Sequence, residues 1–158
     1  MTPTALRPML PTDIPTLASI ARAAIEEIAV EDYSESQCAA WAETLEDDLA
    51  KRVTDALTLV ATRDGTPVGF GSLVDNSHID LLYVDPRAAR SGVATTLLDA
   101  LEKLATARGA KELTADASDT AKPLFDARSF VALRRNTITL GDEWLANTSM
   151  KKTLGPKQ

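Results

Sequence analysis

The stretch from His78 to Gly109 constrains the fold of this chain more than any other. A run typical of a β-strand, HIDLLYV, is followed by Asp85-Pro86, a short loop and a helix. Pro86 lacks a backbone N–H and disfavours a helical conformation for the residue before it, so the strand should end there. Apolar residues at helical spacing then predict a helix that begins near Ser91 and ends before Gly109; they are Val93, Leu97, Leu101 and Leu104.

The start of this helix has the properties of an anion-binding site. Its first backbone N–H groups have no partner within the helix, and the aligned peptide dipoles add positive potential. Gly92 has no side chain, and Ser91 and Ala94 have small ones, so a pyrophosphate could approach the main chain closely. Arg87 and Arg90 would add positive charge at the rim. The alternative is an ordinary loop and helix start, in which Gly92 serves only the turn.

The remaining patterns predict an α/β sandwich with a mixed sheet. Ser34 and Gln37 have the spacing of a capping box that opens a helix carrying Cys38 and Trp41, and a separate, more polar helix is expected after it. Further strands are predicted at 5–9, 56–62, 67–74, 111–116, 131–140 and 144–152, and helices from residue 12 or 13 onward, at 45–53 and at 120–128. We expect a single domain over residues 1–154 and a loose tail at 155–158.

Two motifs resemble those of the GCN5-related N-acetyltransferases, a family that transfers acetyl groups from acetyl-CoA to amines. The first is Leu-x-Val-x-Pro followed by a Gly-x-Gly/Ala turn, and its matches here are Leu82, Val84, Pro86, Gly92 and Ala94. Ala89 stands where the family usually has Gln or Arg, which implies a weaker contact with the coenzyme. The segment SDTAKPLFDARSF of this chain, residues 118–130, resembles the second motif of the family. There Phe125 replaces a tyrosine that in many members protonates the departing thiolate.

The resemblance implies the family's fold, a mixed and mostly antiparallel sheet flanked by helices. In that fold the strands equivalent to HIDLLYV and KELTAD splay apart, and the pantetheine arm of the coenzyme pairs with the exposed strand edges. A bulge near Leu82 would point an N–H at the thioester carbonyl. The residues that the resemblance and the anion site together assign to coenzyme binding are Leu82, Tyr83, Val84, Arg87, Arg90, Ser91, Gly92, Val93, Ala94, Thr95, Ser118 and Phe125.

The alternation of side chains along the strand 78–84 indicates candidate catalytic residues. A period of two puts His78 and Asp80 on the same face as Leu82, opposite a face that would pack into the core. An alkylammonium must lose a proton before it can attack, and histidine, with an unperturbed pKa of about 6.5, suits that task. We therefore predict His78 as the base, with Asp80 orienting the substrate or raising the basicity of the ring. The alternative is that His78 caps the preceding turn and Asp80 pairs with a cation.

The acid that would protonate the thiolate is left open by the sequence. Tyr33 and Ser118 are the candidates, and the thiolate, with a pKa of about 8.5, could also leave unprotonated. Tyr33 could instead recognise the acceptor or pack beside Trp41. The predicted function is an acetyl-CoA-dependent N-acetyltransferase that acts on a small primary amine by direct attack in a ternary complex. The alternative is a domain that binds acyl-CoA as a sensor or interaction module without turnover.

Composition narrows the partners. The net charge of −6 offers no large basic surface for nucleic acid and does not favour contact with an anionic membrane. The one cysteine, Cys38, excludes an intrachain disulfide and reads as a buried core residue, and one histidine and one cysteine make no recognisable metal-ligand cluster. No apolar run approaches the length of a membrane span. We expect a cytoplasmic protein, and the resemblance makes a homodimer possible.

Overall fold

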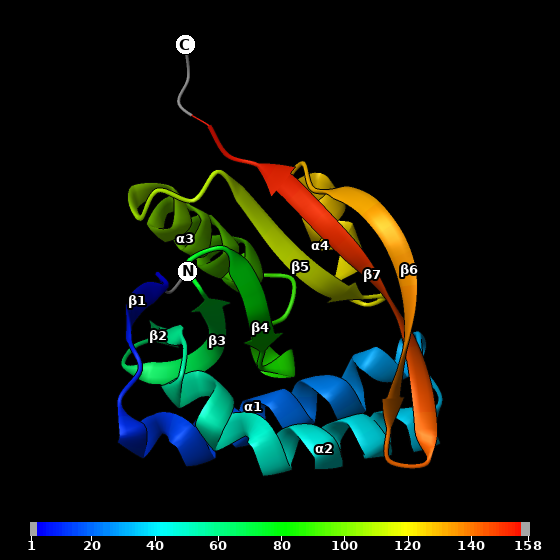
Figure 1. Ribbon diagram of the computed structural model, residues 1–158. Helices are drawn as coiled ribbons and strands as arrows, with labels where there is room; N and C mark the ends of the chain where they lie inside the picture. The colour runs from blue at the N-terminus through cyan, green and yellow to red at the C-terminus, as the bar shows by residue number, and fades with distance from the viewer. Residues whose placement is uncertain (1–2, 156–158) are drawn as a thin grey trace.

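The computed structural model describes residues 3–155 and contains one seven-stranded sheet with helices on both faces (Figure 1). The sheet order is β1-β2-β3-β4-β5-β7-β6, and every neighbouring pair is antiparallel except β4 and β5. This confirms the predicted fold class. The elements are β1 (Ala5–Pro8), η1 (Pro11–Asp13), α1 (Ile14–Glu27), η2 (Ala29–Glu31), α2 (Glu35–Thr54), β2 (Leu57–Arg63), β3 (Thr66–Val74), β4 (His78–Val84), η3 (Pro86–Ala88), α3 (Val93–Ala107), β5 (Glu112–Ser118), α4 (Lys122–Ala127), β6 (Val131–Leu140) and β7 (Glu143–Thr153).

The two faces of the sheet carry separate hydrophobic clusters. Helices α1 and α2 lie side by side and cover one face, where they pack against Val60, Phe70 and Leu81. Helices α3 and α4 contribute to the other cluster, which includes Ile79 and Leu113. In Figure 1 the hairpin of β6 and β7 reaches down to α2, which it also contacts. The central strands are thus covered on both sides.

Helix α2 differs from the prediction, which divided this region into two helices. It runs unbroken over twenty residues, because its buried positions follow one apolar stripe at helical spacing and no Gly or Pro interrupts them. The buried positions are Cys38, Ala42, Leu45, Leu49 and Val53. The capping box is confirmed: Gln37 N donates to Ser34 Oγ at 3.1 Å, and Ser34 N donates to Gln37 Oε1 at 2.8 Å.

Strands β4 and β5 pair only briefly. His78 aligns with Thr114 and Ile79 with Ala115, after which no further pairs join the two strands in the part of the chain that the structure describes. This is the predicted splay, and it opens the centre of the sheet.

Two further predictions from the sequence concern the C-terminal tail and membrane-spanning helices. Of the predicted tail, residues 156–158 lie outside the described residues, so the tail stays a prediction. Within residues 3–155, none of the helices combines the length and the hydropathy needed to cross a membrane.

Candidate active site

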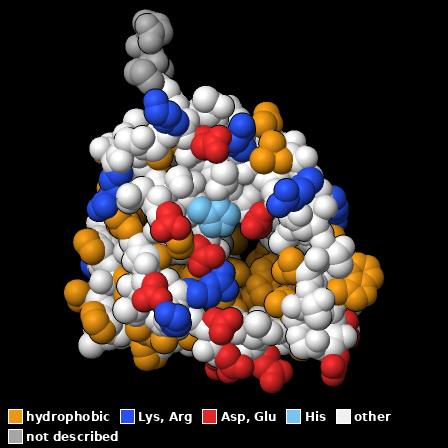
Figure 2. Space-filling view, in the orientation of Figure 1, with side chains coloured by type: hydrophobic (Ala, Val, Ile, Leu, Met, Phe, Trp, Pro, Cys, Tyr) orange, Lys and Arg blue, Asp and Glu red, His pale blue; other side chains and the backbone are white. Residues whose placement is uncertain are grey.

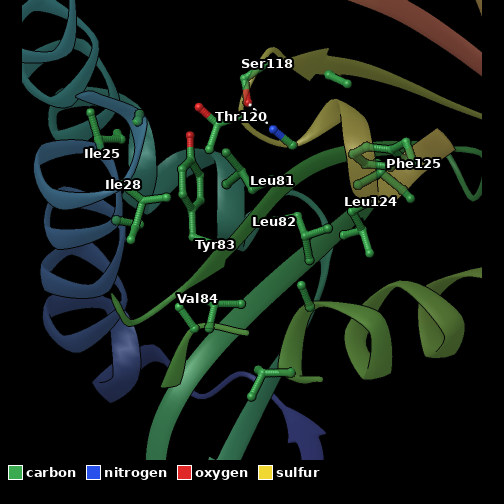
Figure 3. A pocket seen from close by; sticks show the side chains of 18 of the residues that line it. Ile25, Ile28, Leu81, Leu82, Tyr83, Val84, Ser118, Thr120, Leu124 and Phe125 are labelled. Carbon is green, nitrogen blue, oxygen red and sulfur yellow. Dashed lines mark hydrogen bonds between the residues drawn. The ribbon is translucent and has the colours of Figure 1, made fainter. Parts of the chain in front are cut away.

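Two cavities meet at the splay between β4 and β5. The first cavity, about 530 Å³, extends from the loop before α3 along β4 to β5 and α4. In Figure 3 the side chains of Ile25 in α1 and of Ile28 just after it lie on one side of the cavity, and those of Leu124 and Phe125 on the other. The second cavity, about 270 Å³, lies between α2, β4 and the β6–β7 hairpin. Six residues line both: Trp41, Ile79, Asp80, Tyr83, Asp116 and Ser118.

The N-terminus of α3 opens onto the first cavity. Gly92 is the N-cap residue with a φ of 89°, and the first hydrogen bond of the helix runs from Thr96 N to Gly92 O at 3.0 Å. The preceding N–H groups therefore have no intrahelical acceptor. A Cβ added at Gly92 would meet nothing within 4 Å, so the space beside this residue is open. Five of the predicted coenzyme-binding residues line the cavity here: Arg90, Gly92, Val93, Ala94 and Thr95.

Two other predicted coenzyme-binding residues instead hold the loop together. Arg87 forms an ion pair with Asp85 at 2.8 Å, which lowers the pKa of that carboxyl below its ordinary value. The Ser91 hydroxyl donates to Ala88 O at 2.5 Å. Neither Arg87 nor Ser91 lines the first cavity, since their side chains are engaged within the loop itself. Their observed contacts are structural ones that fix the shape of the turn.

A β-bulge in β4 overturns the predicted alternation of side chains. Ser72 of β3 aligns with Leu81 and Leu73 with Ile79, so Asp80 is the extra residue without a partner. The bulge lies two residues before the position expected from the family resemblance. Because an extra residue shifts the period of two, the side chains after it change face.

The two hydrophobic clusters show that the side chains after the bulge change face. Leu81 belongs to the cluster of α1 and α2, and Tyr83 packs against that cluster. Leu82 packs against the cluster that includes Leu98 of α3, on the opposite face. The prediction that put Leu82 on the same face as His78 and Asp80 is therefore wrong.

His78 is held by the neighbouring strand. Its Nδ1 lies 2.7 Å from Thr114 Oγ1, and its Nε2 lies 4.0 Å from Asp116 Oδ2. The Thr114 hydroxyl also lies within hydrogen-bond distance of Ser77 O, at 3.4 Å. The ring lines the second cavity. Thr114 and Asp116 were not among the predicted site residues. The parallel pairing of two strands with alternating side chains is the signal that could have indicated them.

Asp80 is engaged with a cation. Arg52 of α2 donates to Asp80 through Nε at 3.0 Å and through Nη2 at 2.9 Å, in a two-point contact. This is the pairing that the sequence analysis kept as an alternative. Arg52 itself was missed, because nothing in the pattern of a polar helix distinguishes one of its arginines from another.

Two tyrosines lie near the junction of the cavities. The Tyr33 hydroxyl donates to Ala146 O at 2.6 Å and accepts from Asp119 N at 2.9 Å. Burial raises the pKa of Tyr33, and its ring packs edge-on against Trp41. The Tyr83 hydroxyl accepts from Trp41 Nε1 at 3.1 Å, and burial raises the pKa of Tyr83 to about 12.

Helix α4 and the residues before it form another wall of the first cavity. Ser118 Oγ accepts from Ala121 N at 3.1 Å and so fixes the turn that leads into the helix. Phe125 is buried and packs edge-on against Phe130, with ring centroids 5.0 Å apart. Both Ser118 and Phe125 line the first cavity, as do Leu82, Tyr83 and Val84.

Comparisons with known proteins agree on one family. The family model described as "Acetyltransferase (GNAT) domain" matches residues 29–154. The chain is 34% identical over 146 residues to the uncharacterized N-acetyltransferase YafP of Escherichia coli K12, covering 92% of this chain and 93% of that protein. A crystal structure from Rhodopseudomonas palustris, described as a GCN5-related N-acetyltransferase and as a class-II aminotransferase, shares 52% identity and a TM-score of 0.94, with 98% of each chain covered.

A more distant structure shares the fold. The PaiA N-acetyltransferase of Thermoplasma acidophilum, solved in complex with coenzyme A, matches with a TM-score of 0.77 at 21% identity, over 96% of this chain and 99% of that one. Together, the family model, the E. coli relative and the R. palustris structure show that the chain belongs to the GNAT family of acetyltransferases.

Proposed function

We propose that the protein is an acetyl-CoA-dependent N-acetyltransferase that acts on a small primary amine by direct attack in a ternary complex. The observation that carries this proposal is the meeting of the two cavities beside His78 and Asp80, with a helix N-terminus at the far end of the first. PaiA of T. acidophilum was solved with coenzyme A, and YncA of Salmonella typhimurium, 20% identical to this chain, with acetyl-CoA. These relatives support the choice of donor.

The residues of the first cavity fit this donor. Residues 92–95, whose N–H groups begin α3, line the cavity, and the space beside Gly92 is open, which suits a pyrophosphate. Arg90 lines the cavity there as well and adds positive charge. The splayed part of β4, residues 82–84, offers main-chain groups that are not paired with β5, which suits the amides of pantetheine. Bound there, acetyl-CoA would supply an acetyl thioester at the junction of the cavities.

We assign the base to Nε2 of His78. The Thr114 hydroxyl has one proton, and Ser77 O is an acceptor that cannot donate. If that proton is directed to Ser77 O, the hydroxyl oxygen accepts from Nδ1–H of His78, so Nε2 carries the lone pair. Nε2 is the nitrogen near Asp116, at the junction, where it can take a proton from the ammonium group of an acceptor. Asp80, through its contact with Arg52, fixes the wall of the second cavity.

Tyr83 is the hydroxyl that we assign to the reaction in place of Tyr33. The Tyr33 proton is already donated to Ala146 O, and its oxygen accepts from Asp119 N. The Tyr83 oxygen accepts from Trp41, while within residues 3–155 no acceptor is found for its proton. With a pKa of about 12 it stays protonated at neutral pH, so it can donate a hydrogen bond to negative charge that develops at the junction.

The first experiment measures coenzyme A release with a panel of primary amines. We expect turnover by the wild type and a loss of about 10²–10⁴-fold in kcat for His78→Ala, the range typical of a general base. The dissociation constant for coenzyme A should be unchanged in this variant, which checks that it is folded. Phe125, at the position of the usual acid, keeps the sensor alternative open, and that alternative predicts tight binding of acetyl-CoA with no turnover of any amine.

The second experiment tests the phosphate site with two glycines in matching conformations. Gly92 has a φ of 89° and Gly109, at the other end of α3, a φ of 87°, and an added Cβ meets nothing within 4 Å at either. Glutamate at either position should therefore cost a similar amount of stability, about 1–3 kcal/mol. Only Gly92→Glu should weaken coenzyme A binding, by at least about tenfold, because only there does the carboxylate meet the pyrophosphate. Equal affinities in the two variants would refute the placement.

A cytoplasmic location and a homodimer stay predictions from the sequence and the family resemblance.

A further inference from the structure

The second cavity has an apolar side and a polar one. Trp41 and Tyr83 form an aromatic wall, with ring centroids 6.4 Å apart. Aliphatic side chains from α2 and from the β6–β7 hairpin complete this apolar side: Leu45, Ile138, Leu140 and Leu145. An apolar or flat group of a ligand packs most favourably against such side chains, because the contact removes apolar surface from water. The cavity therefore suits an acceptor with a hydrophobic body.

The charged groups of the cavity come from α2, β4 and β5, and they leave a negative balance. Three charged side chains line it, namely Arg52, Asp80 and Asp116. The charge of Arg52 is offset by its two-point contact with Asp80. Asp116 accepts from the Ser149 hydroxyl at 2.7 Å, and within residues 3–155 neither a Lys nor an Arg forms an ion pair with it.

Figure 2 shows the same distribution from outside. Acidic side chains surround the histidine at the mouth of a hollow, and hydrophobic side chains line the interior beside it. A cation that enters this mouth meets Asp116 and Nε2 of His78 together, 4.0 Å apart. An acceptor carboxylate would meet Asp116 as well, and the one arginine of the cavity is already paired.

We propose that the acceptor is a monocationic primary amine with an apolar body and no carboxylate, bound in the second cavity with its ammonium group at Asp116 and His78. This inference rests on the proposed function and names its substrate class. Asp116 is then the residue that selects for positive charge, and the wall of Trp41 and Leu145 the surface that selects for the apolar body. Because Arg52 is paired with Asp80, the carboxylate of an amino acid would find no unpaired arginine in the cavity. Amino acids should therefore bind poorly.

The test compares amines that differ only by a carboxylate. We expect 2-phenylethylamine to be acetylated with a kcat/KM at least about tenfold higher than that of L-phenylalanine, and hexylamine to exceed 6-aminohexanoate by a similar factor. Asp116→Asn should raise the KM for 2-phenylethylamine by about tenfold. Asp64→Asn, which removes the same charge from an exposed turn, should leave it unchanged.

A binding measurement separates the inference from the reaction itself. Because His78 is the only histidine of the chain, its ring resonances report on the cavity without overlap. Titration with 2-phenylethylamine should shift them in the wild type and in Asp64→Asn, and much less in Asp116→Asn. Equal turnover of the carboxylated amines would overturn the proposed acceptor class while leaving the acetyltransferase intact. Binding of acetyl-CoA without turnover of any amine would overturn the proposed function and this inference with it.

Discussion

At the scale of single residues, the arrangement around His78 depends on side chains of the neighbouring strand. Thr114 contacts one ring nitrogen and Asp116 faces the other. Since the two ring nitrogens differ in whether they carry a proton, the partner of Nδ1 decides whether Nε2 can act as a base. A threonine that contributes no atom to the reaction would thereby control which nitrogen faces the acceptor.

The assignment of the proton can be measured directly. We expect ¹⁵N NMR of the single histidine to show a protonated Nδ1 and an unprotonated Nε2 in the neutral ring. Thr114→Val, which keeps the shape of the side chain but removes the hydroxyl, should mix the two tautomers and lower kcat about tenfold. Thr114→Ser keeps the hydroxyl and should restore both the spectrum and the rate. A wild-type ring protonated on Nε2 would contradict the assignment.

Tyr83 gives a second prediction at this scale. Tyr83→Phe removes the hydroxyl that accepts from Trp41 and, in our proposal, donates to the developing charge. We expect kcat to fall about 10²-fold or more, as for the loss of a donor to an oxyanion, with little change in coenzyme A affinity. Tyr33→Phe serves as the comparison. It should lower stability by removing the hydrogen bonds to Ala146 and Asp119, while kcat of the folded protein stays within about threefold.

Some of these residues could be predicted from the sequence and others could not. Gly92 and the helix start could be predicted because Pro86 ends the strand, apolar residues at helical spacing follow, and the family motif has a glycine at this position. The faces of Leu82 and Tyr83 were not, because one extra residue at Asp80 reverses the alternation and leaves no mark in the pattern. Arg52 was hidden for a different reason, since its role depends on how α2 crosses β4, which is a matter of tertiary packing.

At the scale of the elements, an ion pair joins β1 to the start of α1. Asp13 accepts from Arg7 Nη1 at 2.7 Å and Nη2 at 2.9 Å, and from Leu10 N at 2.8 Å. The hydrogen bonds from Arg7 are the main cause that lowers the pKa of Asp13 below its ordinary value. The pair closes the connection between the edge strand and the helix, which also explains why Asp13 is buried although it is charged.

This ion pair predicts a pH-dependent contribution to stability. Asp13→Asn should lower the free energy of unfolding at pH 7 by about 1–2 kcal/mol, between the values typical of charged hydrogen bonds and of exposed ion pairs. Because the folded-state pKa is lowered, the contribution is complete above the unfolded pKa of about 3.9 and disappears as the pH falls through the folded value. Denaturant unfolding at pH 7 and pH 3 checks this. A difference between the two proteins that stayed constant over that range would contradict it, and Asp64→Asn serves as the control for charge.

At the scale of the whole molecule, the sheet has a weak seam. The strands from β1 to β4 form one antiparallel group and β5, β7 and β6 another, and within residues 3–155 two aligned positions join them. Helices α1 and α2 help to hold the groups together, since α1 contacts β3 and β4 while α2 contacts both β2 and β7. A molecule that occupied the seam would bridge the groups along the rest of its length.

Coenzyme binding should therefore stabilise regions far from the pyrophosphate. At a free concentration about 100 times its dissociation constant, coenzyme A should add about 2.7 kcal/mol and raise Tm by about 5–11 °C. Hydrogen exchange should slow in the second half of β4 and in β5 together, as well as at the start of α3. Protection confined to the start of α3 would show that the seam is not bridged.

The bulge at Asp80 has a consequence for how such a protein can diversify. Upstream of it, β4 presents His78 to a chamber walled by α2 and the β6–β7 hairpin; downstream, it presents Leu82 and Val84 to a chamber walled by α3 and α4. The walls that belong to one cavity alone can change by mutation while the other cavity keeps its shape, because one extra residue in β4 divides the strand between the two cavities. Deleting Asp80 would restore a regular alternation along β4. The residues before and after this position could then no longer serve separate cavities, and both sites would be lost.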